Sequence, residues 1–359
     1  MSTYIIRFSL FVYMILIHLS GISQVQLNAD GPGNTYGLIN SVLAPGYNAI
    51  EVPDCGHNSF GEHIDEVFDS ELNVNVFRFI IHVSPDDDRC INFDRQRNEI
   101  KTYDKSPDNL LGVENETVRY EWKFKLPVGF QTSPNFSHIH QLKSVGDQFD
   151  HMPMYTLTAR KGNPDRLELR YAETGTQTTL SQTDLAPFLG TWVSVTETIE
   201  YRNPGAYSIE IRKVADSSVV FSYSNSSIMN WRVGADFLRP KWGIYRSLIN
   251  AQDLRDEEIL YAGFSIEELF PVSIEESGAI GEEVLLFPNP VGEALQLQNL
   301  PTGVYSVQLL SSDGRILLER ETGAVSGLKL DVSSFANGLY FLRLIGGDIH
   351  STHLVSKKN

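Results

Sequence analysis

Alternating apolar and polar positions run through much of the chain and predict β-strands. The segment VRYEWKFKL at 118–126 places Val118, Tyr120, Trp122 and Phe124 on one face, with charged residues between them. Strand side chains alternate with a period of two, so this segment is typical of a strand with one buried face. The same alternation recurs at 154–161, 166–171, 191–201, 207–214 and 219–224, and turn sequences such as KGNPD, NPG and ADSS separate these segments.

Helical periodicity is weak by comparison. A short helix is predicted only at 61–72, in the sequence GEHIDEVFDSEL. Many antiparallel strands at this spacing predict an all-β fold, a β-jelly roll of the concanavalin A-like sandwich type, over residues 24–268.

The two ends of the chain differ from this central region. Arg7, an apolar run at 8–17 and the small residues Gly21 and Ser23 predict a secretory signal peptide over 1–23. No later segment approaches the ~20 continuous apolar residues of a membrane span, so we expect no transmembrane segment.

Near residue 270 the composition becomes polar and acidic. The sequence PVSIEESGAIGEE predicts a linker over 269–284. Short strand signals with turns at SSDGR and FANGLY follow, which predict a small separate β-sandwich over 285–359.

Charge and cysteine content narrow the function classes. A formal net charge of −16 and a pI near 5.0 argue against a nucleic-acid-binding protein, which would need a basic domain. A local basic surface on an acidic protein can still bind an anionic substrate. The only cysteines, Cys55 and Cys90, are expected to form a disulfide in an oxidising compartment, with two buried free thiols as the alternative.

Three short stretches carry candidate chemistry, and the first is DRQRNEIK. It places Arg95, Arg97, Glu99 and Lys101 on one strand face. Such a row could be a solvated outer face. The second stretch is RPKWGIYRS at 239–247, in which Lys241 and Tyr245 share a face at i, i+4.

The third stretch, SHIHQLK, is expected to place His138, His140 and Leu142 on one face, with Gln141 and Lys143 on the other. Two histidines at i, i+2 could be a core pair, a metal pair or a catalytic pair. A zinc or iron site of the cupin type would need a carboxylate a few residues later, and HIHQLKSVGD lacks one at that position, so the metal interpretation is not favoured.

Together these stretches resemble the jelly-roll polysaccharide lyases. Alginate lyases of this fold carry the motifs R-[ST]-E-[LV]-R, Q-[IV]-H and Y-F-K-A-G-[VI]-Y-N-Q, and this chain has RNEIK at 97–101, HIH at 138–140 and KWGIY at 241–245 in the same order. Lys101 replaces an arginine, His138 stands where glutamine is usual, and Arg246-Ser247 replaces the Asn-Gln ending. The longer runs around these motifs are similar to ulvan lyases and heparin-lyase-like proteins of marine Bacteroidota, over residues 26–268.

This resemblance implies a secreted endolytic lyase that cleaves a uronate polysaccharide, ulvan above all, by β-elimination. Glucuronan, alginate or heparin-type glycans are alternative substrates, and a non-catalytic carbohydrate-binding jelly roll is the alternative function. Arg97 and His138 are expected to neutralise the uronate carboxylate, with Lys241 as an alternative. His140 or Tyr245 is expected to remove the C5 proton, and Tyr245 also suits the acid that protonates O4.

Further residues are expected to support this chemistry. Glu99 is interpreted as the orienting partner of Arg97, and Lys143 as a reserve candidate for the base. Substrate contacts are expected from Lys101, Lys123, Lys125, Lys143 and Arg246, and the cations Arg119, Arg160 and Arg170 could also line the site. The chemistry needs no cofactor. The acidic run PDDDR at 85–89 could bind a structural calcium ion or could be a solvated turn, and His57, His63 and His82 have no assigned role.

The C-terminal segment resembles the sorting domain of the type IX secretion system of Bacteroidota. The matching features are FPNP at 287–290, DGR at 313–315, GLYF at 338–341 and the basic pair at 357–358. An ordinary carbohydrate-binding or Ig-like module is the alternative. The resemblance implies passage through the outer membrane and removal or anchoring of the domain. The expected partners are therefore the secretion machinery and an anionic polysaccharide, and we expect a monomer.

Overall fold

The computed structural model describes residues 24–269, 284–300, 305–311, 316–323, 327–346 and 349–358. The chain divides into two compact units, Met1–Leu269 and Phe270–Asn359. The predicted signal peptide at 1–23 lies outside the described residues, and so do residues 270–283 of the predicted linker. Within the described ranges, no helix is long and apolar enough to cross a membrane.

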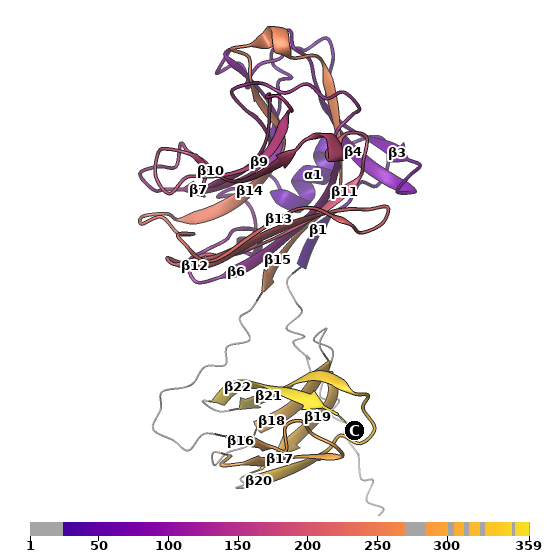
Figure 1. Ribbon diagram of the computed structural model, residues 1–359, viewed down its shortest axis with the longest axis vertical. Coiled ribbons are helices and arrows are strands. Elements are labelled where there is room, and N and C mark those ends of the chain that lie inside the picture. The colour runs from indigo at the N-terminus through magenta and orange to yellow at the C-terminus, as the bar shows by residue number, and fades with distance from the viewer. Residues whose placement is uncertain are drawn as a thin grey trace, which may run out of the picture. The chain divides into compact units, whose positions relative to one another are not determined.

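The first unit is built from two antiparallel β-sheets, which form the upper and lower layers of this unit in Figure 1. The strands of the eight-stranded sheet in spatial order are β13 (Val219–Ile228), β12 (Gly205–Lys213), β11 (Val193–Glu200), β6 (Thr117–Lys125), β15 (Glu257–Leu269), β4 (Val74–Ile81) and β3 (Ile64–Asp69), with β1 (Gln24–Leu27) paired to β15. Strands β13, β12, β6 and β15 of the eight-stranded sheet lie in the lower layer, while its β4 and β3 lie at the upper right of the unit in Figure 1.

The seven-stranded sheet forms the upper layer. Its strands in spatial order are β10 (Thr178–Asp184), β9 (Arg166–Tyr171), β8 (Tyr155–Arg160), β7 (Ser137–Val145), β14 (Phe237–Ser247), β5 (Arg95–Lys101) and β2 (Ile50–Glu51). The neighbours β7, β14 and β5 come from distant parts of the sequence, and they carry all three of the chemically interesting stretches. The predicted all-β jelly-roll fold is confirmed.

The core lies between the two sheets and is rich in aromatic rings. Strand β6 shows the predicted alternation, because its apolar residues are buried and its charged residues are partly exposed. The ring of Trp122 on β6 lies 6.0 Å from that of Trp242 on β14, and Phe264 on β15 lies 5.0 Å from Trp242. Burial of these large rings supplies much of the apolar area that holds the layers together.

The predicted helix at 61–72 is wrong. This segment contains strand β3, whose first four residues alternate between buried and half-buried and which pairs antiparallel with β4. Sheet pairing outweighs the local helical pattern here. Among residues 24–269, the α-helix is α1 (Thr35–Leu43), and short 3₁₀ helices occupy Asp108–Leu110, Ala186–Phe188 and Ala251–Asp253.

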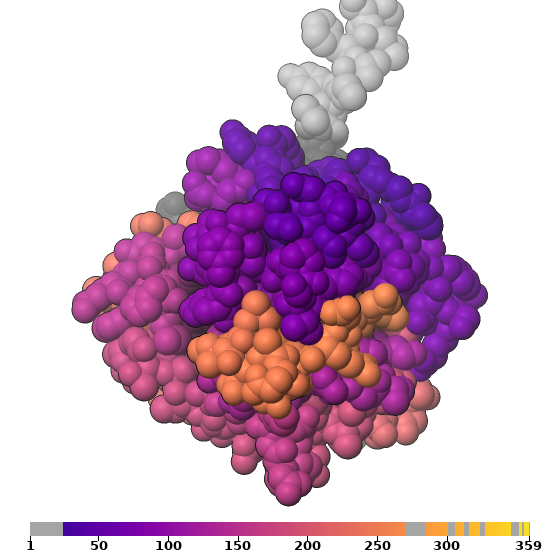
Figure 2. Space-filling model, turned by 90° about the horizontal axis from the view of Figure 1, so that it is seen from above, coloured from indigo at the N-terminus to yellow at the C-terminus, as the bar shows by residue number. Residues whose placement is uncertain are grey.

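Long-range contacts join loops at one edge of the seven-stranded sheet. The predicted disulfide between Cys55 and Cys90 is confirmed, and it links the segment after β2 to the segment before β5. The orange segment near residue 250 in Figure 2 lies beside earlier parts of the chain, where Asn135 Nδ2 donates to Asn250 Oδ1 at 2.9 Å. The backbone N–H of Leu248 also donates to the carbonyl oxygen of Asp94 at 2.8 Å. These contacts fix the loops that flank Arg95.

The second unit contains two small antiparallel sheets. The three-stranded sheet is β16 (Leu285–Phe287), β17 (Ala294–Gln298) and β20 (Gly327–Asp331). The four-stranded sheet is β19 (Ile316–Thr322), β18 (Tyr305–Ser311), β21 (Gly338–Gly346) and β22 (Ile349–Lys357). Leu295, Leu309 and Leu342 are among the residues of its own hydrophobic core.

Candidate active site

Strand β5 carries charged side chains on the outer face of the seven-stranded sheet. As predicted, this face carries Arg95, Arg97, Glu99 and Lys101. Arg95 donates a hydrogen bond to Tyr245, Arg97 to Glu99, and Lys101 to Glu51. The intervening Asn98 points the other way, and its Nδ2 donates to the carbonyl oxygens of residues 63 and 80 at 2.8 and 2.7 Å. Strict alternation thus places the charged side chains of β5 on the outer face and Asn98, which anchors the strand, on the inner face.

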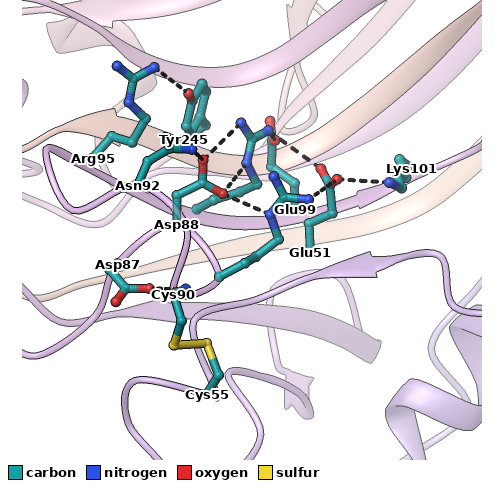
Figure 3. A network of polar contacts seen from close by, with 12 residues as sticks. Glu51, Cys55, Asp87, Asp88, Cys90, Asn92, Arg95, Glu99, Lys101 and Tyr245 are labelled. Atoms are coloured by element: carbon teal, nitrogen blue, oxygen red, sulfur yellow. Dashed lines mark hydrogen bonds and ion pairs between the residues drawn. A yellow bond between two sulfur atoms is a disulfide. The ribbon is translucent and has the colours of Figure 1, made fainter.

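Tyr245 lies on this outer face beside Arg95, as Figure 3 shows. Its position on β14 pairs with Arg97 on one side and with His138 on the other. The guanidinium carbon of Arg97 lies 3.7 Å from the centre of the Tyr245 ring, and Arg95 Nη1 donates to the tyrosine hydroxyl at 3.0 Å. The hydroxyl is therefore held beside two guanidinium groups on a half-buried side chain.

The imidazole of His138 is oriented by a chain of hydroxyl groups. Gln177 Nε2 donates to Thr156 Oγ1 at 3.1 Å, Thr156 and Thr158 share a hydrogen bond of 2.9 Å, and Thr158 Oγ1 lies 2.8 Å from His138 Nδ1. If each hydroxyl donates its hydrogen bond toward the histidine, His138 Nδ1 accepts one from Thr158 and Nε2 carries the ring hydrogen. Burial and the nearby guanidinium of Arg170 lower the pKa of His138 to about 3, so the ring is neutral.

A β-bulge in β7 changes the predicted face of His140. Against β8, two steps from His138 to His140 correspond to one step on the partner strand, so Ile139 and His140 both point into the core. His140 is 1% exposed, its Nε2 lies 2.8 Å from Glu197, and Trp122 covers its ring at 4.4 Å. The expectation that His138 and His140 share a face is wrong. A polysaccharide on the outer face could not reach His140, which corrects its expected role as the base.

The bulge also decides which other side chains join the outer face. After His140 the strand alternates again, so Gln141 and Lys143 point outward together with His138, while Leu142 is in the core. From the core side, the hydroxyl of Tyr261 lies 2.8 Å from the carbonyl oxygens of Ile139 and Gly243. These carbonyls lie where the pairing of β7 with β14 is irregular, so Tyr261 compensates for the interrupted hydrogen bonds.

Gly243 is required by the close approach of β14 and β5. Its φ is +140°, and a Cβ at this position would lie 2.1 Å from the carbonyl oxygen of Asn98. We expect Gly243→Ala to lower the free energy of unfolding by about 1–3 kcal/mol, because the two strands must move apart. Urea denaturation measures this change. Gly46→Ala is the control, since Gly46 also has a positive φ, but a Cβ added there would meet no atom within 4 Å apart from its chain neighbours. Equal losses of unfolding free energy in both variants would contradict the steric explanation.

Glu51 is the functional residue that sequence reasoning missed. Its Oε1 accepts hydrogen bonds from Arg89 and Lys101, each at 2.8 Å, and its Oε2 contacts Arg97 and Lys241. Burial acts to raise the pKa of Glu51, but these four cations lower it well below its usual range. Glu51 lies on a two-residue strand, which is too short for a recognisable pattern, so no sequence signal points to this role.

Carboxylates neutralise only part of the positive charge at this site. Glu99 bonds to Arg97 and Gln141, which agrees with its expected orienting role, and it is fully buried. Lys143 and Arg239 occupy paired positions on β7 and β14, and neither takes part in an ion pair with another described residue. We call the cationic face the set Arg95, Arg97, Lys101, Lys143, Arg239 and Lys241.

Other expected substrate contacts lie elsewhere. Lys123 and Lys125 are on β6, on the outer face of the eight-stranded sheet, and Lys125 Nζ pairs with Glu71 at 2.7 Å. Arg246 is fully buried and bonds to Gln96 at 2.8 Å. These three expectations are wrong, because alternation turns Arg246 away from Tyr245 and β6 belongs to the other sheet.

The remaining arginines also divide between the two sheets. Arg160 and Arg170 lie on the seven-stranded sheet, where both pair with Glu168. Arg119 lies on the other sheet and pairs with Glu267. Of the three additional cations, only the first two are therefore on the sheet of the cationic face.

The acidic run at 85–89 distributes its carboxylates among different partners. Asp88 Oδ1 accepts from Arg97 Nε and Arg89 Nε, each at 2.8 Å. Asp87 accepts from the backbone N–H of Cys90 at 2.7 Å, and Asp86 faces the histidines discussed below. Calcium ligands must converge on one point, so this arrangement does not favour the calcium interpretation. Instead, Asp88 anchors Arg97.

The largest hollow among the described residues of the other sheet has a different chemistry, while Lys123 is the one cation that lines two smaller hollows there. This largest hollow, of about 510 Å³, is lined by Thr198, Ser208, Ser224, Asn225 and other residues, none of them lysine or arginine. A site for a uronate needs cations or donors at the carboxylate. We therefore place the candidate active site on the cationic face.

Comparisons with known proteins address the two units separately. The family model described as a secretion system C-terminal sorting domain matches residues 285–357. This confirms the expected type IX sorting domain, which indicates export through the outer membrane to the cell surface or the medium. No curated protein sequence matches the chain.

Similar solved structures include several polysaccharide lyases. An endo-β-1,4-glucuronan lyase from the fungus Trichoderma reesei is 13% identical with a TM-score of 0.40, and the match covers 58% of this chain and 87% of that chain. A marine alginate lyase from Aplysia kurodai is 10% identical with a TM-score of 0.48, covering 68% and 98%. An alginate lyase from Pseudomonas aeruginosa is 14% identical with a TM-score of 0.38, covering 57% and 86%.

The class of protein follows from the fold and the C-terminal match. The chain is an exported all-β protein in which a jelly-roll unit precedes a secretion sorting domain.

Proposed function

We propose that the jelly-roll unit is an endolytic polysaccharide lyase that cleaves uronate-containing chains by β-elimination, with ulvan as the first candidate substrate. The observation that carries the proposal is the tyrosine hydroxyl of Tyr245, held beside Arg95 and Arg97 on the same face as His138. The motif resemblance of the three strands to jelly-roll lyases supports it.

The reaction requires three tasks at adjacent atoms. The C5–H bond breaks, a double bond forms between C4 and C5, and the C4–O4 bond breaks as O4 takes a proton. Negative charge builds on the uronate carboxylate as the C5 proton leaves, so fixed donors at that position lower the barrier. Arg97, Lys241 and the Nε2–H of His138 are the candidate donors.

Tyr245 is the best-placed group for proton transfer. His140 is in the core, and the low pKa of His138 makes that ring a weak base. Tyr245 can take the C5 proton as a phenolate and return it to O4, and both neighbouring guanidinium groups stabilise the phenolate charge. One residue would then serve as base and acid, which implies that both protons move on the same side of the sugar ring.

The distribution of cations favours a densely anionic polysaccharide. Ulvan combines uronic acid with sulfated rhamnose, so it presents sulfates in addition to carboxylates. Lys143 and Arg239 have no carboxylate partner among the described residues, and they lie on the same face as Tyr245. They could bind an anionic group next to the uronate that is cleaved.

The proposal is tested with the full chain and four substrates. Ulvan, glucuronan, alginate and heparin are incubated with the protein, and the ultraviolet absorbance of the unsaturated uronate is followed. We expect absorbance to rise with ulvan, together with an early fall in polymer size that marks endolytic cleavage. Binding of these glycans without new absorbance would make the protein a carbohydrate-binding module instead.

Lys241 gives this activity an expected pH dependence. Burial lowers the pKa of Lys241 to about 7, and the neighbouring carboxylates only partly offset this effect. As pH rises through this value the ammonium loses its proton, so the cationic face loses one positive charge. KM for an anionic substrate should therefore increase above about pH 7.

The Lys241→Arg variant tests the cause of this change. An arginine keeps its charge across this pH range, so the rise in KM should disappear. Lys125→Arg, on the other sheet, should keep the wild-type profile. An unchanged rise in the Lys241→Arg variant would assign the pH effect to another group.

A further inference from the structure

Three histidines and one aspartate converge from the two segments that the disulfide joins. His57 and His63 come from the segment between β2 and β4, and His82 and Asp86 follow β4. One ligand atom from each of the four side chains lies within 4.8 Å of all the others. The side chains of His63 and Asp86 are fully buried, while those of His57 and His82 are 17% and 19% exposed.

A single carboxylate faces all three imidazoles. Asp86 Oδ1 lies 2.8 Å from His57 Nδ1 and 3.2 Å from His63 Nε2, and Asp86 Oδ2 lies 3.1 Å from His82 Nδ1. The three imidazole rings lie 4.9–5.6 Å apart, centre to centre. Three imidazole nitrogens therefore converge on the two oxygens of one buried carboxylate.

The groups behind the histidines fix their orientation. His63 Nδ1 lies 2.7 Å from Asp54 Oδ1, and the hydroxyl of Tyr36 donates to the other oxygen of Asp54 at 2.8 Å. With Nδ1–H donated to Asp54, Nε2 of a neutral His63 presents its lone pair toward Asp86. A carboxylate behind a histidine is the usual outer support of a metal ligand. Phe60 packs against the three histidines with ring centres 4.5–5.4 Å away, which limits solvent access.

We propose that His57, His63, His82 and Asp86 bind one Zn²⁺ ion. Three imidazole nitrogens and one carboxylate oxygen form the four-ligand set that zinc accepts in tetrahedral geometry. Calcium and magnesium prefer oxygen ligands, so this set selects against them. Because the protein supplies four ligands, no position is left for a reactive water, and the ion would be structural.

The site would stabilise the loops that hold the cationic face. The ligands come from the same two segments that Cys55–Cys90 joins. Asp86 is followed two residues later by Asp88, which anchors Arg97, and the backbone N–H of Arg97 also bonds to the carbonyl oxygen of residue 87 at 3.3 Å. Zinc binding would therefore act on catalysis only indirectly, through the position of Arg97.

The test measures zinc directly on the full chain with its disulfide intact. After incubation with Zn²⁺ and dialysis, we expect about one zinc per chain by elemental analysis, and a higher Tm than in the chelator-treated protein. Co²⁺ should replace zinc and give the visible spectrum of a tetrahedral site. These readouts do not depend on enzymatic activity.

Matched variants locate the ion. His57→Gln and His82→Gln change the two partly exposed ligands, so the fold should persist, and both should lose stoichiometric zinc and the Tm increase. His151→Gln is the control, because His151 is exposed and outside the cluster; it should keep both. A folded wild-type protein that retains no zinc and shows no zinc-dependent Tm would overturn the proposal and make the cluster a proton-linked ion-pair network. Equal zinc retention in all three variants would also overturn it.

Discussion

Replacing Tyr245 with phenylalanine should lower turnover by about 10²-fold or more, the usual range for a lost acid–base group, and should change KM little. The ring would keep its contacts with Arg97 and with Phe136, whose ring centre lies 5.1 Å away. Only the hydroxyl would be lost, and Arg95 would keep its pair with Asp94. The variant therefore removes proton transfer without removing the cations that bind the substrate.

The measurement is the initial rate of ultraviolet absorbance over a range of substrate concentrations. Tyr103→Phe is a suitable control, since Tyr103 also lies near a cation, with Lys101 Nζ 5.1 Å from its ring centre, but on a loop beyond the end of β5. It should have wild-type turnover. Near-normal turnover in Tyr245→Phe would show that another group transfers the proton, and Lys143 would be tested next.

Removal of Arg97 should affect catalysis, substrate binding and stability together. Arg97 is 8% exposed, and its guanidinium contacts Asp88, Glu99 and Glu51. Arg97→Ala would leave these carboxylates without their shared partner, and breaking a buried pair in this way costs about 3–5 kcal/mol of unfolding free energy. Loss of a donor at the developing negative charge should reduce kcat by about 10²–10³-fold, and KM should rise as well.

Two further variants separate these effects. Arg97→Lys keeps the positive charge, so stability should be largely retained, while the forked guanidinium contacts with its three carboxylates are lost and turnover stays low. Arg119→Ala removes an ion pair with Glu267 on the eight-stranded sheet and should leave turnover unchanged. Wild-type kcat in a folded Arg97→Lys protein would mean that a positive charge at position 97 is sufficient for catalysis without the guanidinium geometry.

Features that depend on local alternation could be predicted from the sequence. Strand β6 has the predicted buried and exposed positions, and Arg95, Arg97, Glu99 and Lys101 share a face because β5 is regular. Residues two apart must then point the same way. The disulfide between Cys55 and Cys90 could also be predicted, since the chain contains no other cysteine.

Features that depend on pairing between distant strands could not be predicted in this way. Nothing in the sequence of β6 shows which sheet it joins, so the expected substrate contacts of Lys123 and Lys125 are wrong. Glu51 reaches its four cations only because β2 pairs with β5. Arg246 is different: its expected substrate contact is wrong although strand alternation next to Tyr245 is enough to predict an inward side chain.

The bulge in β7 affects how this strand can be compared with those of other proteins. The chain has one residue more between His138 and Gln141 than a regular strand needs to turn both side chains outward. An alignment with a regular strand must therefore contain a one-residue gap at Ile139 or His140. Without the gap, every position on one side of the bulge is matched to a residue of the opposite face, and a functional role would be transferred to a side chain in the core.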